Sequence, residues 1–377
     1  MTSFNAFTPP ARLLLGPGPS PVSPRVLAAL AQPTIGHLDP AFVGLMDEIK
    51  ALLRTAFRTE NEMTLPLSGP GSVGMEACVI NLIEPGDAVV VCQNGVFGGR
   101  MAEVVRRCGG QPIVVESPWG RAVDIERVEA ALRAHPRARA LGFVHAETST
   151  GARSDAEALA RLARAHDCLT IVDAVTSLGG SPLEVDAWDL DAVYSGSQKC
   201  LSCVPGLSPV TFSARAMQTI AQRQHPVQSW FLDMGMLASY WQGDGGRSYH
   251  HTAPINALYA LHEALRVVVD EGLPAAWERH REQHLALIAG LEQLGVSPVV
   301  PASERLCQLN CVSIPPGVDE ADVRRRLLLD HGIEIGAGLG ALAGKVWRIG
   351  LMGHGCRAEN VERFLTALAG TLDRAGN

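Results

Sequence analysis

The chain has 377 residues, of which 47% are hydrophobic and 38 are glycine, and this fits one large domain with a smaller one. Its formal net charge of -7, with no run of five basic residues, excludes a surface built for nucleic acid or anionic lipid. No apolar run reaches the ~18 residues of a membrane-spanning helix, so we expect no membrane association. The nine cysteines are scattered, which favours a cytoplasmic location, and Cys200-x-x-Cys203 has no second pair at zinc-site spacing, which favours no metal.

The N-terminal region reads as an arm followed by two helices. Residues 12–24 are rich in proline and glycine, which predicts a segment without regular structure. A short helix follows, and a longer amphipathic helix is expected at 42–57. Gly36 and His37 lie in the linker between the helices, where a glycine allows close approach of a ligand. A tight turn is the alternative explanation.

From residue 63 onward, short apolar runs alternate with helical patterns. The runs expected as strands lie at 63–67, 88–92, 113–115, 141–145, 169–172 and 192–194. This alternation predicts an α/β fold with a mainly parallel sheet covered by helices on both faces. Ligands of such sheets bind at the carboxyl ends of the strands. The run at 207–212 is expected as an antiparallel strand at the sheet edge.

Three of these strand ends carry residues suited to a phosphorylated, planar ligand. Gly71 and Ser72 lie in a glycine-rich turn at the start of a helix, where free N–H groups suit a phosphate. Close packing of the turn explains the glycines equally well. Phe97 stands between glycines, so its ring can lie against a planar ligand or belong to the core. Thr148 lies in a hydroxyl-rich loop that can donate hydrogen bonds or begin a helix.

The next two strand ends carry ionisable groups. Asp173 ends an apolar strand, and a buried carboxylate is costly unless a cation such as arginine or a ring nitrogen pairs with it. The stretch 191–201 delivers Lys199 to a strand end. The only other lysines are Lys50 and Lys345, so a lysine in this Ser/Gly-rich loop favours amine chemistry with a carbonyl, which arginine cannot supply. A solvated loop lysine is the alternative.

A domain boundary is predicted at 272–274, where Gly-Leu-Pro separates two helical patterns. The chain then divides into an N-terminal arm at 1–24, a large domain at 25–272 and a small C-terminal α+β domain at 273–377. In the last strand of the small domain, Arg348 stands among apolar residues, which implies a carboxylate partner. This partner is either a carboxylate of the protein, in a structural ion pair, or the carboxylate of a substrate, and both alternatives stay open.

Together these features describe a site for pyridoxal phosphate (PLP) and an amino acid. Here the chain resembles the class V, fold-type I PLP-dependent aminotransferases, closest to the alanine/serine–glyoxylate group. The resemblance covers nearly the whole length and rests on Gly-Pro-Gly-Pro at 16, Ile-Glu-Pro-Gly-Asp at 83, His-x-Glu-x-Ser-Thr-Gly at 145, Val-Asp-Ala-Val-x-Ser-x-Gly-Gly at 172, Ser-Gly-Ser-Gln-Lys at 195, Tyr-His-His-Thr at 249 and Gly-Lys-Val-x-Arg-Ile-Gly at 344. It implies a large domain with a mainly parallel seven-stranded sheet and a smaller C-terminal domain.

The resemblance also implies residue roles. Lys199 would bind the cofactor covalently and move a proton during catalysis, and Asp173 would bond the pyridine nitrogen. The remaining roles are Gln198 beside the cofactor, Phe97 against its ring, Thr148 near its 3-hydroxyl, Gly71 and Ser72 on its phosphate, Tyr249 and Thr252 on the phosphate of the neighbouring subunit, and Arg348, Gly36 and His37 on the substrate. The working unit would be a homodimer with active sites at the interface.

The implied reaction is ping-pong transamination from alanine or serine to glyoxylate or pyruvate. Two departures stand out: relatives often have Trp at Phe97 and Ser-Gly-His at 70–72. The nearest alternatives are ureidoglycine–glyoxylate and pyridoxamine–pyruvate aminotransferases, and the ureidoglycine group carries Gln and Asn where this chain has His37 and Tyr249. A cysteine desulfurase would need a catalytic cysteine in an active-site loop, and none is evident. A catalytically silent PLP-binding protein and a cofactor-free metabolite-binding protein are further alternatives.

Overall fold

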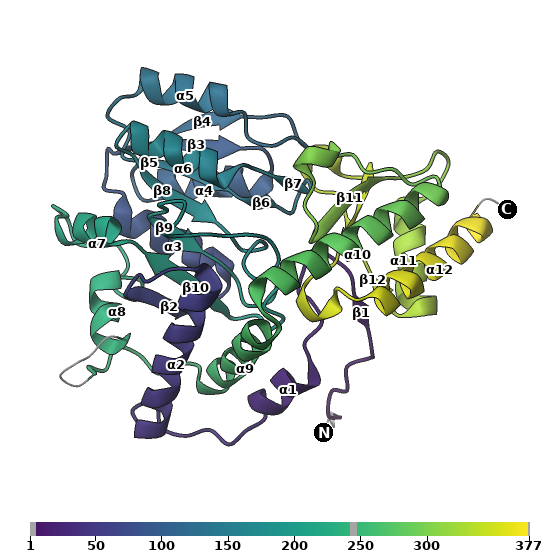
Figure 1. Cartoon of the computed structure of the whole chain (residues 1–377), viewed down its shortest axis with the longest axis horizontal. Helices are drawn as coiled ribbons and strands as arrows, with labels where there is room; N and C mark the ends of the chain where they lie inside the picture. The colour runs from purple at the N-terminus through teal and green to yellow at the C-terminus, as the bar shows by residue number, and fades with distance from the viewer. Residues whose placement is uncertain (1–4, 242–246, 376–377) are drawn as a thin grey trace, which may run out of the picture.

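A computed structural model describes residues 5–241 and 247–375, and a seven-stranded sheet forms the centre of its larger part (Figure 1). The strand order is β2 (Met63–Ser68), β10 (Leu207–Phe212), β9 (Ala192–Tyr194), β8 (Leu169–Asp173), β5 (Ala140–Val144), β3 (Ala88–Gln93) and β4 (Gln111–Glu116). β10 is antiparallel to both of its neighbours, and the other strands run in one direction. The predicted α/β class with a mainly parallel sheet is confirmed.

The prediction for 207–212 is half wrong. The strand is antiparallel as expected, but it lies inside the sheet between β2 and β9, not at an edge. Pro209 has no N–H for its partner Ser195 on the β9 side. Ser208 supplies the missing donor, because its hydroxyl donates to the Ser195 carbonyl at 2.7 Å, while Ser195 N–H still reaches the Pro209 carbonyl at 2.8 Å.

Helices cover both faces of this sheet. α3 (Gly71–Leu82) and α4 (Val96–Arg107) contact each other on one face, and α5 (Ile125–Ala134) and α6 (Ala156–Ala165) contact each other on the other. Right-handed crossovers require this, because α3 and α4 connect strands towards β4 whereas α5 and α6 lead back. α2 (Pro40–Phe57) and α9 (Ile255–Glu271) pack together beside β2 and β10.

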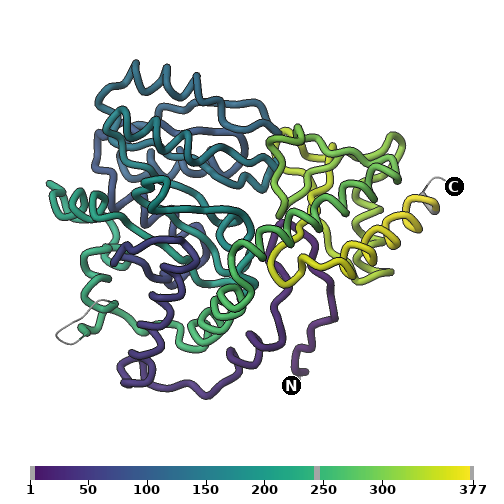
Figure 2. The backbone as a smooth tube through the Cα atoms, viewed as in Figure 1, coloured from purple at the N-terminus to yellow at the C-terminus, as the bar shows by residue number. Residues whose placement is uncertain are grey.

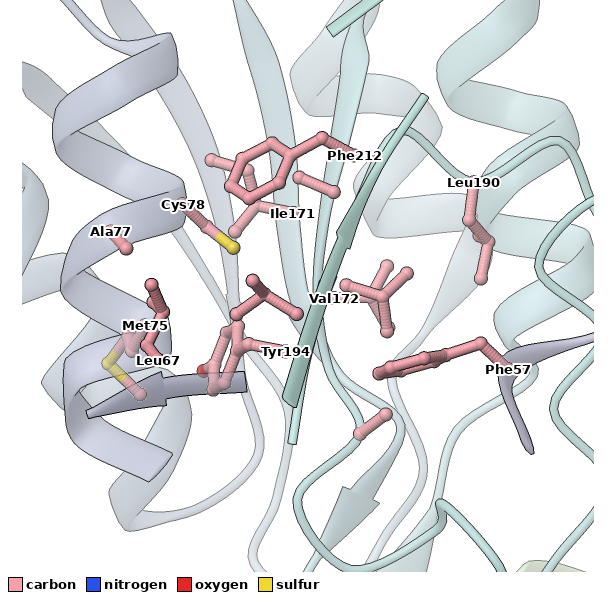
Figure 3. Packing of buried hydrophobic residues seen from close by; sticks show 14 of the residues in the cluster. Phe57, Leu67, Met75, Ala77, Cys78, Ile171, Val172, Leu190, Tyr194 and Phe212 are labelled. Atoms are coloured by element: carbon pink, nitrogen blue, oxygen red, sulfur yellow. The ribbon is translucent and has the colours of Figure 1, made fainter. Parts of the chain in front are cut away.

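The main core shows the alternation of side chains that a two-sided sheet requires. In Figure 3, Tyr194 and Phe212 lie on the side of Met75 and Cys78 from α3, while Val172 faces Phe57 and Leu190. Successive residues of a strand point to opposite faces. Asp173, the next residue after Val172, therefore points to the opposite face of the sheet, which α3 covers. There it lies beside Tyr194, its partner in the pairing of β8 with β9.

The C-terminal part folds around a second core. It contains α10 (Leu273–Gln293), β11 (Leu309–Ser313), α11 (Glu320–His331), β12 (Ile333–Glu334), β13 (Gly336–Ala337), β14 (Val346–Gly350) and α12 (Ala358–Ala375). β14 is the antiparallel centre of a three-stranded sheet. The main cluster of buried apolar side chains runs to Leu273, and the second is built mainly from residues beyond it. The exact division into domains stays a prediction.

The N-terminal arm is more ordered than its composition predicts. β1 (Leu13–Leu14) pairs in parallel with β12, and Leu13 and Leu15 join the second core. Figure 2 shows the arm running along the C-terminal part before it reaches α1 (Pro24–Leu30). The prediction of no regular structure at 12–24 is wrong at β1, because the strand exists only through a partner at the far end of the chain.

The remaining elements are short connections. They are β6 (Ala146–Glu147), β7 (Ala152–Arg153), α7 (Ala214–Ala221), α8 (Met234–Trp241) and the 3-10 turns Ala302–Glu304, Gly340–Leu342 and Gly353–Gly355. Among the helices in the described ranges, none combines the length and apolarity that crossing a membrane requires.

Candidate active site

A cavity opens where β2, β3, β5, β8 and β9 end, so the expectation that ligands bind at the carboxyl ends of the strands has a place in the structure. The loops after these strands line it. The sequence-predicted site residues among its walls are Gly71, Ser72, Phe97, Thr148, Asp173, Gln198 and Lys199. The topology thus brings together residues that are more than a hundred positions apart in the sequence.

Lys199 lies in the turn after β9 with its amine in the cavity, and it is not a solvated loop lysine. Its Nζ donates a hydrogen bond to the Pro17 carbonyl of the N-terminal arm. Burial lowers the pKa of the amine to about 8, although the charge of Asp173 acts in the opposite direction. About a tenth of this amine is therefore unprotonated and nucleophilic at pH 7, far more than for an ordinary lysine.

Asp173 ends β8 and is 4% exposed. Its Oδ1 accepts the Val175 N–H at 2.9 Å, and its Oδ2 accepts the Tyr194 hydroxyl at 2.8 Å. Burial raises its pKa to about 6, and both hydrogen bonds oppose that rise. The carboxylate is thus held in one orientation by two fixed donors, and a cationic ring nitrogen would relieve the cost of its burial.

The first turn of α3 faces the same cavity. Its cap residue, Pro70, offers no side-chain hydrogen bond, so the N–H groups of Gly71 and Ser72 have no acceptor within the helix. A Cβ on Gly71 would lie 3.0 Å from Val175 Cγ2 and 3.4 Å from the Ser195 carbonyl oxygen, so the close packing favours glycine. The turn presents free N–H groups and the positive end of the helix dipole to an anion.

Phe97 lies in the first turn of α4, and its side chain lines another wall of the cavity. Its N–H donates to Glu147 Oε2 at 3.1 Å. The same carboxylate accepts both the N–H and the hydroxyl of Ser149, at 3.0 and 2.6 Å. Because Glu147 is buried beneath the loop, it fixes the start of α4 against the loop that carries Thr148.

Arg348 is buried beside the loop that carries Thr148. Its Nε donates to the Ala337 carbonyl at 2.7 Å, and its Nη1 donates to the Thr148 carbonyl at 3.1 Å. Within the described ranges, no carboxylate forms an ion pair with it, which argues against a purely structural ion pair. Its charge lowers the pKa of Lys199, so the two cations are close enough to interact.

The other sequence-predicted site residues lie outside the cavity of their own chain. Gly36 is exposed, and the ring of His37 lies 5.3 Å from that of Tyr249 between centroids. Tyr249 is 63% exposed, and Thr252 is exposed as well. The structure therefore brings His37 and Tyr249 together, and none of these four residues lines the cavity of Lys199.

Sequence reasoning missed several residues that shape the site. Arg100, Tyr194 and Val175 line the cavity, and Pro17 contacts the lysine. The position of Tyr194 at a strand end and the spacing of Arg100 one turn after Phe97 were available as signals. Nothing local could have placed Pro17. Across 5–241 and 247–375, no group of three or more His, Cys, Asp or Glu side chains is arranged to hold a metal ion.

The donor set fits PLP group by group. The Lys199 amine can condense with its aldehyde, Asp173 can pair with its ring nitrogen, and the free N–H groups of α3 can bind its phosphate. The buried Oε1 of Gln198 also lacks a hydrogen-bond partner within the part of the chain that the structure describes, and it lies at this cavity. Fold and site together define a PLP-dependent enzyme of fold type I.

Comparison with known proteins gives the family. A family model described as aminotransferase class-V matches residues 14–364. The alanine–glyoxylate aminotransferase of Oryctolagus cuniculus is 41% identical over 96% of this chain and 93% of its own. The chain belongs to the class-V aminotransferases and is a PLP-dependent transaminase.

Solved structures agree with this assignment over the full length. That of an alanine–glyoxylate aminotransferase from Nostoc sp. superposes with a TM-score of 0.96 at 48% identity, and covers 98% of both chains. That of a ureidoglycine–glyoxylate aminotransferase from Bacillus subtilis has the same TM-score at 39% identity, over 99% of this chain and 96% of the other. The fold predicted from the resemblance is therefore confirmed.

Proposed function

We propose that this enzyme transfers the amino group of a small neutral amino acid, alanine or serine, to glyoxylate or pyruvate. The observation that carries the proposal is the placement of the Lys199 amine and the Asp173 carboxylate in one cavity, with Arg348 hydrogen-bonded to Thr148 of its wall. Support also comes from the relatives named alanine–glyoxylate aminotransferase, which match the whole chain at about 40% identity.

When bound, PLP supplies an electron-withdrawing ring that stabilises negative charge at the substrate Cα. The chain's own residues do the rest. Asp173 would hold the ring nitrogen in its protonated form, Lys199 Nζ would take the proton from the substrate Cα, and Arg348 would orient the substrate carboxylate. The donor leaves as a 2-oxo acid before the acceptor enters, so we propose a ping-pong sequence.

A second candidate function is ureidoglycine–glyoxylate transamination. A Bacillus subtilis relative with that name is 38% identical over 97% of this chain. Against it stands the pair His37 and Tyr249, whose rings lie 5.3 Å apart where that group carries Gln and Asn. We therefore rank alanine and serine ahead of ureidoglycine as donors. Pyridoxamine–pyruvate transfer stays a third candidate.

We further propose that the working unit is a cytoplasmic homodimer. Tyr249 and Thr252 are exposed and away from the cavity of their own chain, so a second copy is needed to bring them to a phosphate. A cytoplasmic location is supported by the nine cysteines, all of which are unpaired. Light scattering of the purified protein tests the dimer, and a monomer with full activity would contradict shared sites.

A donor screen tests the reaction. Alanine, serine, ureidoglycine and pyridoxamine are each paired with glyoxylate and with pyruvate, and the 2-oxo or aldehyde product is measured. We expect the highest kcat/KM for alanine or serine with glyoxylate. Faster turnover of ureidoglycine or pyridoxamine would replace the proposed substrate. Tight PLP binding with turnover of no donor would indicate a catalytically silent protein.

A further inference from the structure

Arg100 places a positive charge at the mouth of the cavity. It follows Phe97 by one turn of α4, and its Cζ lies 5.0 Å from the centre of the Phe97 ring. Its Nη1 lies 3.5 Å from Ser72 Oγ, at the outer limit of a hydrogen bond. The guanidinium thus stands between the ring-stacking wall and the first turn of α3, and it lines the cavity with Asp173 and Lys199.

Among the residues that the structure describes, no carboxylate neutralises the charge of Arg100. The other arginines of α4 behave differently, because Arg106 and Arg107 both pair with Glu103, at 2.6 and 2.9 Å. Arg100 also contributes to lowering the pKa of Asp173, so its field extends across the cavity. An unpaired guanidinium directed at a cavity is suited to a bound anion.

The anion with the matching position is the phosphate of the cofactor. Gly71 and Ser72, which have free N–H groups at the start of α3, line the same cavity as Arg100. These groups carry only partial charges, whereas a phosphate ester carries nearly two negative charges at neutral pH. The short Ser72 side chain leaves room for a longer, positively charged side chain to reach the first turn of α3. A full positive charge from a neighbouring helix would complete the cradle.

We propose that Arg100 is the side-chain cation that binds the PLP phosphate together with the first turn of α3. The proposal rests on PLP being the cofactor. The competing explanation is that Arg100 only supports the Phe97 ring through a cation–π contact, and so acts on the stacking wall. The two explanations differ in whether the effect of Arg100 requires the phosphate group.

The test compares PLP with pyridoxal, which lacks the phosphate. Apo forms of the wild type, Arg100→Gln, Arg100→Lys and Arg107→Gln are titrated with each ligand, and bound chromophore and tryptophan fluorescence are followed. We expect Arg100→Gln to weaken PLP binding by about tenfold, since an exposed charge-assisted contact lies at the low end of its range. Pyridoxal binding should stay within about twofold, Arg100→Lys should lie between, and Arg107→Gln should match the wild type.

A second measurement avoids the ring altogether. Inorganic phosphate should raise the Tm of the apo wild type and of Arg107→Gln, and raise that of Arg100→Gln clearly less. Equal loss of PLP and pyridoxal binding in Arg100→Gln would overturn the proposal in favour of the Phe97 contact. Unchanged binding of both ligands and an unchanged phosphate response would also overturn it. Failure of the wild type to bind PLP would instead refute the cofactor assignment.

Discussion

The hydroxyl of Tyr194 donates a 2.8 Å hydrogen bond to Asp173 Oδ2, and the two residues end neighbouring strands in register. The bond crosses the floor of the cavity. It gives the buried carboxylate one of its two fixed donors, and it opposes the effect of burial, which still leaves the pKa of Asp173 raised to about 6. Tyr194 therefore acts on the chemistry through Asp173 and is a positioning residue.

Replacing Tyr194 by Phe should raise the pKa of Asp173 further, because the opposing hydrogen bond is lost. A smaller fraction of Asp173 is then ionised at pH 7, so the acid limb of the kcat profile moves to higher pH, and the Tm falls by an amount equivalent to about 1–3 kcal/mol. Tyr259 provides the control, since its hydroxyl lies 3.4 Å from the Pro33 carbonyl, at the outer limit of a hydrogen bond, and the residue does not line the cavity. Tyr259→Phe should leave both readouts unchanged, and an unshifted profile in Tyr194→Phe would contradict the assigned role.

Removal of the Lys199 amine should abolish turnover. Lys199→Ala loses both the covalent attachment point and the proton carrier, so we expect kcat to fall by roughly 10³-fold or more. The control is Lys345→Ala, which removes an exposed lysine whose Nζ donates to the Ala341 carbonyl. The kcat of each variant is measured in steady-state assays at a saturating concentration of the amino donor. Wild-type turnover by Lys199→Ala would refute the mechanism.

The rate of covalent PLP attachment to the apo enzyme should depend on pH in a specific way. Only the unprotonated amine attacks an aldehyde, and the pKa of Lys199 is lowered to about 8. The rate should rise with pH below this value and level off above it, as measured by rapid mixing from pH 6.5 to 10. A rate that keeps rising towards pH 10 would indicate an ordinary lysine.

Arg348 should matter for carboxylate-bearing substrates. Arg348→Lys keeps the charge but loses the two-pronged donor geometry, so the KM of the amino donor should rise about tenfold or more. The Tm and the affinity for PLP are measured alongside, because Arg348 also holds the Ala337 and Thr148 carbonyls. An unchanged donor KM with a lowered Tm would mean that its role is structural.

Gly18 should tolerate no side chain. An alanine Cβ there would lie 2.4 Å from Lys199 Nζ, and the residue has φ +105°, which strains any residue other than glycine. Gly18→Ala should lower stability by about 1–3 kcal/mol and slow covalent PLP attachment. Gly370→Ala is the control, because the space around Gly370 in α12 is open and alanine favours a helix. Covalent PLP attachment at the wild-type rate in Gly18→Ala would show that the N-terminal arm shifts to accommodate the added methyl group.

Much of the site was predictable because one rule of topology joins distant loops. Once strands and helices alternate, the carboxyl ends of parallel strands must meet, and so Gly71, Asp173 and Lys199 had to share an edge. Each of these residues also differs from its surroundings in a way that sequence shows: a glycine before a helix, an acid after an apolar strand, a scarce lysine.

The rest depends on contacts that no local pattern encodes. The interior place of β10 requires the Ser208 hydroxyl to replace the donor that Pro209 lacks. The contact of Pro17 with Lys199 joins the start of the chain to its middle. The neutralisation of Arg106 and Arg107, which singles out Arg100, becomes visible only when the partners of each side chain are known.

The pairing of β1 with β12 has a consequence for the order in which the protein is built. Leu13 pairs with Ile333, so the first strand emerges from the ribosome long before its partner exists. The seven-stranded sheet can form during translation, whereas the N-terminal arm can pair only after the C-terminal strands and helices have been made. Pro17 and Gly18 contact Lys199 only when the N-terminal arm packs against the rest of the protein. The final surroundings of the Lys199 amine therefore require both the N-terminal arm and the strand near the end of the chain that holds it.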